Sequence, residues 1–300
     1  MKPAPFDYFA PDSVAEASAL LAQYGYDAKI LAGGQSLVPT MNFRLAQPAV
    51  LVDLNKIPDL DFIEPAPDGG LRIGAMTRQS TVERSALVAR RAPLLHEAMP
   101  LIAHRQIRNR GTIGGSLAHA DPAAELPVVA TALNARFGIR TPDGRDRWVD
   151  ARDFYIALFT TDLAPEEILT EVHIPPAPAR SGFAIQEVAR RHGDYAIVGA
   201  AAAVTLDETG RCRDATLVYL SVGEGPVVAE QAGAMLRGQA PGDELIRAAA
   251  HTAATADIDP TADIHASVAY RRFLAETLGR RVLRAAFARA GAEIVRCETR

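Results

Sequence analysis

Hydrophobic and polar positions divide the chain into a first half of short mixed elements and a second half in which strands precede helices. Ser13 and Glu16 form a capping box, and the apolar spacing after them predicts a helix that ends at Gly25. A break is expected at Pro93 within a helical segment. The other elements predicted in this half are strands at 29–32, 50–54, 71–75 and 167–174, a helical segment at 80–99, and a hairpin formed by 135–139 and 147–149.

The run Pro-Pro-Ala-Pro at residues 175–178 is the most linker-like stretch of the chain, and it predicts a domain boundary after residue 176. Beyond it the pattern predicts strands at 182–190, 196–206 and 215–222, then helices at 227–236, 243–255 and 267–290. Strands followed by helices indicate an α+β domain with helices on one face of an antiparallel sheet.

Length and composition support a globular protein of two domains. The chain has 300 residues, 48% hydrophobic and 23% charged, against a prior of roughly 150 residues per domain. A net charge of −4 gives no electrostatic footprint for nucleic acid. The longest apolar run, 195–206, is shorter than the roughly 20 residues of a transmembrane helix, and the first residues lack a secretory pattern. We therefore expect a cytoplasmic protein with no transmembrane segment.

The reactive side chains exclude several chemistries. Cys212 and Cys297 are far apart and neither is part of a CxxC motif, so no disulfide framework, iron-sulfur site or zinc site is expected in this chain. No HExxH or GxSxG motif occurs, and Ser116, His119 and Asp121 are too close in sequence for a hydrolase triad. Any metal redox centre is therefore expected on another polypeptide.

Two Gly-Gly pairs are the main candidates for binding chemistry. We expect Gly33-Gly34 and Gly114-Gly115 each to follow a strand and to present bare amide N–H groups to a phosphate, with a hydroxyl added by the serine that follows. Two such cradles suit a pyrophosphate. Neither matches the Rossmann GxGxxG or the P-loop pattern. The alternative is that both pairs only reverse the chain direction.

Three strings extend this interpretation: LAGGQSL at 31–37, RNRGTIGGS at 108–116 and HGDYA at 192–196. In this order and spacing the chain resembles the FAD-binding medium subunit of molybdenum hydroxylases, of the carbon monoxide dehydrogenase and xanthine dehydrogenase type, from Phe6 to about Arg289. The resemblance implies an α+β protein. Residues 1–176 would form a two-part FAD-binding domain of the vanillyl-alcohol oxidase and p-cresol methylhydroxylase type. Residues 177–300 would form a smaller carbon monoxide dehydrogenase flavoprotein-like domain.

The resemblance also implies which residues contact FAD. The pyrophosphate would be held by Ala32, Gly33, Gly34, Gln35, Ser36 and Leu37 from the first loop and by Thr112, Gly114, Gly115 and Ser116 from the second. The family often has His where this chain has Gln35, so proton chemistry assigned to that His is not expected here.

Four further positions follow from the same resemblance. Glu125, with Asp121 nearby, matches an acidic residue on the adenosine part of FAD, Ile102 matches an apolar position against the flavin, and Tyr195 matches a tyrosine over one face of the isoalloxazine ring. The alternatives are that the two carboxylates cap or solvate a helix starting near Pro122, that Ile102 is a core residue, and that Tyr195 opens a buried strand.

The arginines of 105–110 and of Arg190-Arg191 allow three interpretations: a solvated face, contact with a partner subunit, or a position near the anionic cofactor. The last helix is expected to be amphipathic with one face toward the core.

The implied function is that of an oxidoreductase subunit in a heterotrimer. FAD would receive electrons singly from an iron-sulfur small subunit and deliver them to an external acceptor such as NAD, oxygen, a quinone or a cytochrome. Substrate hydroxylation would occur at a molybdenum cofactor on a molybdopterin large subunit, so no side chain of this chain is expected to be catalytic. The alternatives are a stand-alone flavin oxidase or reductase of the same fold, and a non-catalytic nucleotide-binding scaffold subunit.

Overall fold

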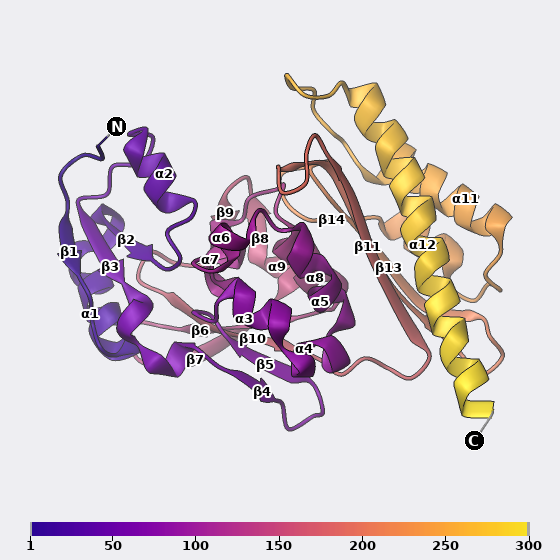
Figure 1. Cartoon of the computed structure of the whole chain (residues 1–300), viewed down its shortest axis with the longest axis horizontal. Helices are drawn as coiled ribbons and strands as arrows, with labels where there is room; N and C mark the ends of the chain where they lie inside the picture. The colour runs from indigo at the N-terminus through magenta and orange to yellow at the C-terminus, as the bar shows by residue number, and fades with distance from the viewer. Residues whose placement is uncertain (1, 299–300) are drawn as a thin grey trace.

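The computed structural model describes residues 2–298, with side chains described to residue 291. Figure 1 shows three regions in a row: a small N-terminal sheet, a central sheet with short helices, and a C-terminal sheet covered by the long helix α12. None of the described helices combines the length and the apolar character that crossing a bilayer requires. The α+β class predicted from the sequence is confirmed.

The N-terminal region is a parallel sheet in the order β1-β3-β2. Its elements are β1 (Asp7–Phe9), α1 (Val14–Tyr24), β2 (Ala28–Leu31), α2 (Leu37–Asn42) and β3 (Val50–Asp53). The predicted cap of α1 is confirmed, because Ser13 Oγ accepts the N–H of Glu16 at 3.2 Å. The Glu16 carboxylate accepts the N–H of Asp12 instead of that of Ser13. Ala17 and Leu21 of α1 pack against Val50 and Val52 to form a small separate core.

The central region is an antiparallel sheet in the order β4-β5-β10-β6-β7. Its strands are β4 (Ile63–Pro65), β5 (Leu71–Gly74), β6 (Arg136–Arg140), β7 (Asp146–Asp150) and β10 (Ile168–Ile174), with a small hairpin of β8 (Tyr155–Ala157) and β9 (Thr160–Thr161). Its helices are α3 (Gln79–Arg84), α4 (Ala86–Arg91), α5 (Pro93–Ala98), α6 (Arg105–Arg108), α7 (Ile113–His119), α8 (Glu125–Ala132) and α9 (Ala151–Phe154). The segment before residue 176 thus contains two separate sheets, as a two-part first domain requires.

The helical segment predicted at 80–99 is correct in type but is divided twice. Pro93 starts a new helix as expected, and Ser85 causes a second break. Ser85 has extended backbone angles and its hydroxyl accepts the N–H of Val88 at 3.3 Å, so it ends α3 and caps α4.

The C-terminal region is an antiparallel sheet in the order β11-β12-β13-β14 with helices on its outer face (Figure 1). The elements are β11 (Ser181–Ala189), β12 (Ala196–Leu206), β13 (Cys212–Leu220), β14 (Val227–Val228), α10 (Glu230–Leu236), α11 (Asp243–Thr252) and α12 (Val268–Glu298). The expectation of a helix from residue 227 is wrong at its start, because Val227 and Val228 pair with β13 and the helix begins at Glu230. Single 3₁₀ turns occupy Gly25–Asp27, Leu54–Lys56, Pro58–Leu60 and Met99–Leu101, and a π-helical turn occupies Ala253–Asp257.

The inner face of the C-terminal sheet packs on α5 and α8 of the central region. Ile185, Ala201 and Val218 belong to the same buried cluster as Leu94 and Val128. The sheet is therefore covered on both faces, and one continuous core crosses the segment 175–180 between β10 and β11. This packing fixes the turn before β12 against the central region.

Candidate functional site

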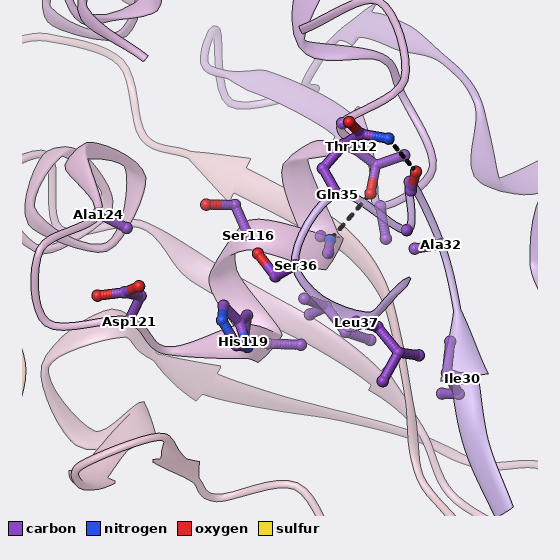
Figure 2. Close-up of a pocket in the computed structure, with 18 of the residues that line it drawn as sticks. Ile30, Ala32, Gln35, Ser36, Leu37, Thr112, Ser116, His119, Asp121 and Ala124 are labelled. Carbon is purple, nitrogen blue, oxygen red and sulfur yellow. Dashed lines mark hydrogen bonds between the residues drawn. The ribbon is translucent and has the colours of Figure 1, made fainter. Parts of the chain in front are cut away.

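One cleft of about 770 Å³ lies between the N-terminal sheet, the N-terminal end of α7 and the turn before β12. All fourteen residues that the sequence analysis assigned to the site line it. Figure 2 shows that the side chains of Ser36, Ser116, His119 and Asp121, which come from two loops and a helix, face this cleft. The tertiary structure thus brings together segments as far apart in the chain as Ala32 and Tyr195.

The first glycine loop follows β2 directly, as expected. None of the amide N–H groups of residues 33–36 donates a hydrogen bond to another described residue. Gly34 has φ +72°, a left-handed conformation that suits glycine. The Gln35 amide donates to the carbonyl of Gly33 at 3.0 Å (Figure 2), so its side chain stabilises the loop. Four consecutive unpaired amides of this kind are a suitable cradle for an anion.

The second glycine loop differs from the expectation. Gly114 and Gly115 do not follow a strand but form the first turn of α7, and Thr112 caps this helix. The amides here are paired: Ile113 N–H with Thr77 O, Gly114 N–H with Ala75 O, Gly115 N–H with Thr112 Oγ1 and Ser116 N–H with Thr112 O. The prediction of bare amides is therefore correct for the first loop and wrong for the second. The second loop offers the Ser116 hydroxyl and the positive end of α7.

The two loops touch each other through their glycines. A Cβ added at Gly33 would lie 2.5 Å from the carbonyl oxygen of Arg110 and 2.7 Å from Gly111 Cα. A Cβ added at Gly115 would lie 3.3 Å from Ala32 Cβ. Glycine is therefore required at position 33 because another backbone occupies that space, in addition to any ligand.

A hydrogen-bond network that the sequence analysis missed holds this contact. Asn55 Nδ2 donates to the carbonyl of Ala32 at 2.9 Å, and Arg78 donates to Asn55 Oδ1 and to the carbonyl of Arg110. Asp53 accepts the N–H of Asn55 at 2.9 Å and the hydroxyl of Tyr8 at 2.5 Å, and the latter bond raises the pKa of Tyr8. The available signal was the pair of polar residues Asp53 and Asn55 at the end of an apolar strand.

The far end of the cleft contains buried acidic groups. Glu125 is the first residue of α8 and is only 8% exposed. Burial, together with the nearby charge of Asp121, raises its pKa to about 7. Burial raises the pKa of Tyr195 as well, and the charges of Asp121 and Glu125 add to this. The charges of both carboxyl groups therefore act on the Tyr195 hydroxyl.

The structure bears differently on the alternative interpretations of Tyr195, Asp121 and Ile102. Tyr195 is 68% exposed, so it does not open a buried strand as a core residue. Asp121 Oδ1 accepts the N–H of Ala123 at 2.9 Å and stabilises the turn before α8, which begins at Glu125 and not near Pro122. Ile102 is 8% exposed and belongs to the core cluster, and it also lines the cleft, so it is a core residue whose contact with the flavin stays a prediction.

The position of Glu125 bears on its predicted role. The sequence analysis assigned Glu125 to the adenosine part of FAD and Tyr195 to the isoalloxazine ring. These two parts are the opposite ends of an extended FAD molecule, whereas the charge of Glu125 acts on the Tyr195 hydroxyl. Both assignments stay predictions.

The basic stretch is not a uniform surface. Arg108 is buried and forms a two-pronged ion pair with Glu83, at 2.9 and 3.0 Å, and it also donates to the carbonyl of Ile102 at 2.9 Å. Arg105 and Arg110 are exposed. Arg108 therefore fixes the backbone beside the cleft and does not belong to a solvated face.

The groups that line the cleft fit an FAD molecule. It joins four unpaired amides and two hydroxyls to an aromatic side chain. Within the residues whose side chains are described, no group of three His, Cys, Asp or Glu side chains is arranged to hold a metal ion. Cys212 is buried, and Cys297 lies outside the described side chains. The residues present therefore fit an organic anionic cofactor.

Comparison with known proteins identifies the family of both parts of the chain. Residues 4–177 match the FAD binding domain in molybdopterin dehydrogenase, and residues 183–286 match the CO dehydrogenase flavoprotein C-terminal domain. The chain is 46% identical to the 6-hydroxypseudooxynicotine dehydrogenase complex subunit alpha of Paenarthrobacter nicotinovorans, over 97% of each chain. It is 39% identical to the carbon monoxide dehydrogenase medium chain of Hydrogenophaga pseudoflava, over 96% of this chain and 99% of that one.

Solved structures extend the likeness to the whole fold. Carbon monoxide dehydrogenase from Hydrogenophaga pseudoflava superimposes with a TM-score of 0.92 at 40% identity, covering 96% of this chain and 99% of that chain. Quinoline 2-oxidoreductase from Pseudomonas putida 86 gives a TM-score of 0.90 at 39% identity, covering 97% and 99%. The chain belongs to the FAD-binding medium subunits of the molybdenum hydroxylase family and is an oxidoreductase subunit.

Proposed function

We propose that this chain is the electron-relay subunit of its complex, acting between iron-sulfur clusters on a small partner subunit and an external acceptor. Substrate hydroxylation would take place at a molybdenum cofactor on a large partner subunit. Bound FAD would supply the chemistry, because a flavin exchanges either one or two electrons. The observation that carries this proposal is the single cleft that joins the unpaired amides of the first loop to the exposed Tyr195.

In this proposal the first loop holds the FAD pyrophosphate. The amide N–H groups of residues 33–36 would donate to the phosphate oxygens, and Ser36 and Ser116 would add their hydroxyls. The N-terminus of α7 would contribute its positive dipole end. Gln35 and Thr112 would stabilise their own loops, since both side chains form hydrogen bonds within these loops.

The flavin ring would lie at the Tyr195 end of the cleft, with Ile102 against it. We therefore propose a contact of Glu125 with the ring end of FAD and not with the adenosine. A carboxyl group with a pKa of about 7 is partly protonated at neutral pH, so it can donate or accept a hydrogen bond there. The adenine would then lie toward Tyr26, Lys29, Ile30 and Leu37, which line the cleft beyond the first loop.

The predicted domain division, residues 1–176 and 177–300, is part of this proposal. The cleft takes its cradle from the first segment and its Tyr195 cover from the second. The cytoplasm as the place of action, the two partner subunits and the acceptor remain predictions, which fractionation and purification of the native complex would test.

The relay is tested by comparing the purified wild-type complex with a complex that contains the Gly33→Val chain. Both complexes are reduced chemically under anaerobic conditions and mixed with NAD⁺, oxygen, a soluble quinone or cytochrome c. We expect the wild type to reoxidise rapidly with at least one acceptor, and the flavin-free variant to keep its iron-sulfur clusters reduced. Equal reoxidation of both complexes would refute the relay.

The same preparation separates the two alternatives from the relay. A stand-alone oxidase requires that the isolated yellow chain turn over an organic substrate. A scaffold requires that the chain remain colourless when FAD is added.

A further inference from the structure

Ser221 lies at a point where three segments of the chain meet, immediately after β13. Its N–H donates to the carbonyl of Pro122 at 2.8 Å, and its hydroxyl donates to the carbonyl of Ala196 at 2.7 Å. Pro122 directly follows Asp121, and Ala196 directly follows Tyr195. One serine thus connects the two segments that carry the residues at the ring end of the cleft.

The backbone of Ser221 is in an unusual conformation for a serine. Its φ is +63°, in the left-handed region that glycine adopts most easily. Strained conformations of this kind persist where the surrounding contacts determine them. A glycine would suit the backbone better, but it would lack the hydroxyl that binds the carbonyl of Ala196. The side-chain hydrogen bond therefore explains why the position carries a serine.

Arg271 of α12 completes the connection from the other side. It is 7% exposed, and its guanidinium donates to the carbonyl of Ile197 and, at 3.0 Å, to that of Ser221. Asp263 holds the guanidinium at 2.6 Å. The carbonyls of the two residues that follow Tyr195 are therefore both fixed, one by Ser221 and one by Arg271.

The opposite side of the same turn is held by close packing. Gly193 has φ +85°, and a Cβ added there would lie 2.6 Å from the ring of His104 and 2.8 Å from the carbonyl oxygen of Ala103. The backbone on both sides of Tyr195 is thus fixed, whereas its side chain is 68% exposed at the cleft. The freedom left to the tyrosine is rotation about its side-chain torsions.

We propose that Ser221 and Arg271 are positioning residues that set where the Tyr195 ring lies relative to the Asp121-Pro122 turn, and thereby how it covers the flavin ring. The inference rests on the proposed function, because it takes Tyr195 as the residue over the flavin. Neither residue lines the cleft, so both would act through the backbone of Tyr195. Loosening this connection would let the tyrosine leave the ring while the cradle at the first loop stays intact.

The decisive variant is Ser221→Gly, because it removes the hydroxyl and relieves the left-handed strain at once. We expect its melting temperature to stay close to that of the wild type, since the two effects oppose each other. Ser221→Ala loses the same hydrogen bond and keeps the strain. Ser181→Ala is the matched control, because Ser181 donates or accepts a similar buried hydrogen bond with Thr205, at 2.9 Å, at the other end of the same sheet.

The readouts are the flavin fluorescence of the oxidised FAD-loaded protein and the rate at which the reduced complex is reoxidised. An aromatic ring stacked on a flavin quenches its fluorescence, so Tyr195→Ala is expected to raise it. Ser221→Gly is expected to give at least half of this rise and a reoxidation rate changed about two- to fivefold. The double variant should add nothing to Tyr195→Ala alone, because both changes act on one residue. FAD affinity should stay within about twofold of the wild type.

Arg271→Lys is the second variant, with Arg289→Lys near the other end of α12 as its control. It should shift the fluorescence in the same direction as Ser221→Gly. The positioning role is overturned if Tyr195→Ala changes the fluorescence while Ser221→Gly and Arg271→Lys match their controls. Failure of the wild-type chain to bind FAD, or no effect of Tyr195→Ala, would instead overturn the proposed function.

Discussion

The two glycine loops have nearly the same local sequence, Gly-Gly followed within two residues by a serine, but their backbone amides differ in hydrogen bonding. The first loop is an irregular connection whose amides at residues 33–36 donate to no other described residue. The second is the first turn of α7, and its four amides at 113–116 are paired. Whether a glycine pair can bind an anion through its backbone therefore depends on where the next helix begins.

The difference has a physical origin in the neighbours of each loop. Gly114 lies against the end of β5, and a Cβ there would be 2.5 Å from Ala75 Cβ. Gly33 lies against the backbone of the second loop. The glycine in the second loop therefore allows a helix to pack closely on a sheet, whereas the glycine in the first allows two loops to meet at the rim of a cleft.

The largest expected effect is that of Gly33→Val on FAD binding. The added side chain displaces the first loop from the second, so several charge-assisted hydrogen bonds to the pyrophosphate are lost together. We expect the affinity for FAD to fall by at least about 100-fold. Titration of the flavin-free chain with FAD measures it. Gly242→Val is the control, since nothing lies within 4 Å of a Cβ at that position. Normal affinity of the Gly33 variant would remove the first loop from the site.

Glu125→Gln tests whether burial raises the pKa of the carboxyl group on the opposite side of the cleft. Burial raises the pKa of Glu125 from 4.5 to about 7, so between these values the folded protein binds a proton that the unfolded chain releases. The free energy of unfolding therefore decreases as pH rises through that window, by up to about 3 kcal/mol. In the flavin-free variant this part of the decrease should disappear in urea unfolding at several pH values. Exposed Glu244→Gln should keep the wild-type slope, and an unchanged slope in Glu125→Gln would contradict the buried-acid interpretation.

Gly114→Ala tests whether Gly114 is needed for the stability of the chain, whereas Gly33 is needed for FAD binding. Its Cβ overlaps Ala75, so we expect a loss of about 1–3 kcal/mol in the stability of the flavin-free chain. Thermal unfolding without FAD measures this loss, with Gly225→Ala as the control because its nearest neighbour would be at an ordinary 3.5 Å. If Gly114→Ala lowered the affinity for FAD as much as Gly33→Val does, the contrast between the loops would be wrong.

The smallest expected effect is that of Thr112→Val, which removes the cap of α7. The Gly115 N–H loses its 3.0 Å bond to the hydroxyl, which should cost about 1 kcal/mol of stability. FAD affinity should change by less than about threefold, because the first loop is intact. Ser85→Ala removes a comparable cap from α4 and is the control for a stability loss outside the cleft. A large loss of affinity in Thr112→Val would show that Thr112 itself contacts the pyrophosphate.

Local patterns were sufficient for most elements of the fold. The cap at Ser13, the strands around the central hairpin and the order of strands before helices in the C-terminal region were predicted because they depend on neighbours in sequence. Two predictions were wrong at single residues. Ser85 divides a segment that was expected to be one helix up to Pro93, and Val227 belongs to a strand and not to a helix. In both cases a contact with a residue elsewhere in the fold or a competing side-chain hydrogen bond decided between two permitted conformations.

By itself, the sequence determined which residue types were available for the site: glycines that permit close approach, hydroxyls, carboxyl groups and one tyrosine near the start of a strand. The tertiary structure alone decided which of their polar groups remain unpaired. Asn55 and Arg78 hold the loops together, and Ser221 fixes the segment after Tyr195 through bonds to residues far away in the chain. A hydrogen-bond donor is free or paired only with respect to its spatial neighbours, and those neighbours are set by packing of the whole chain.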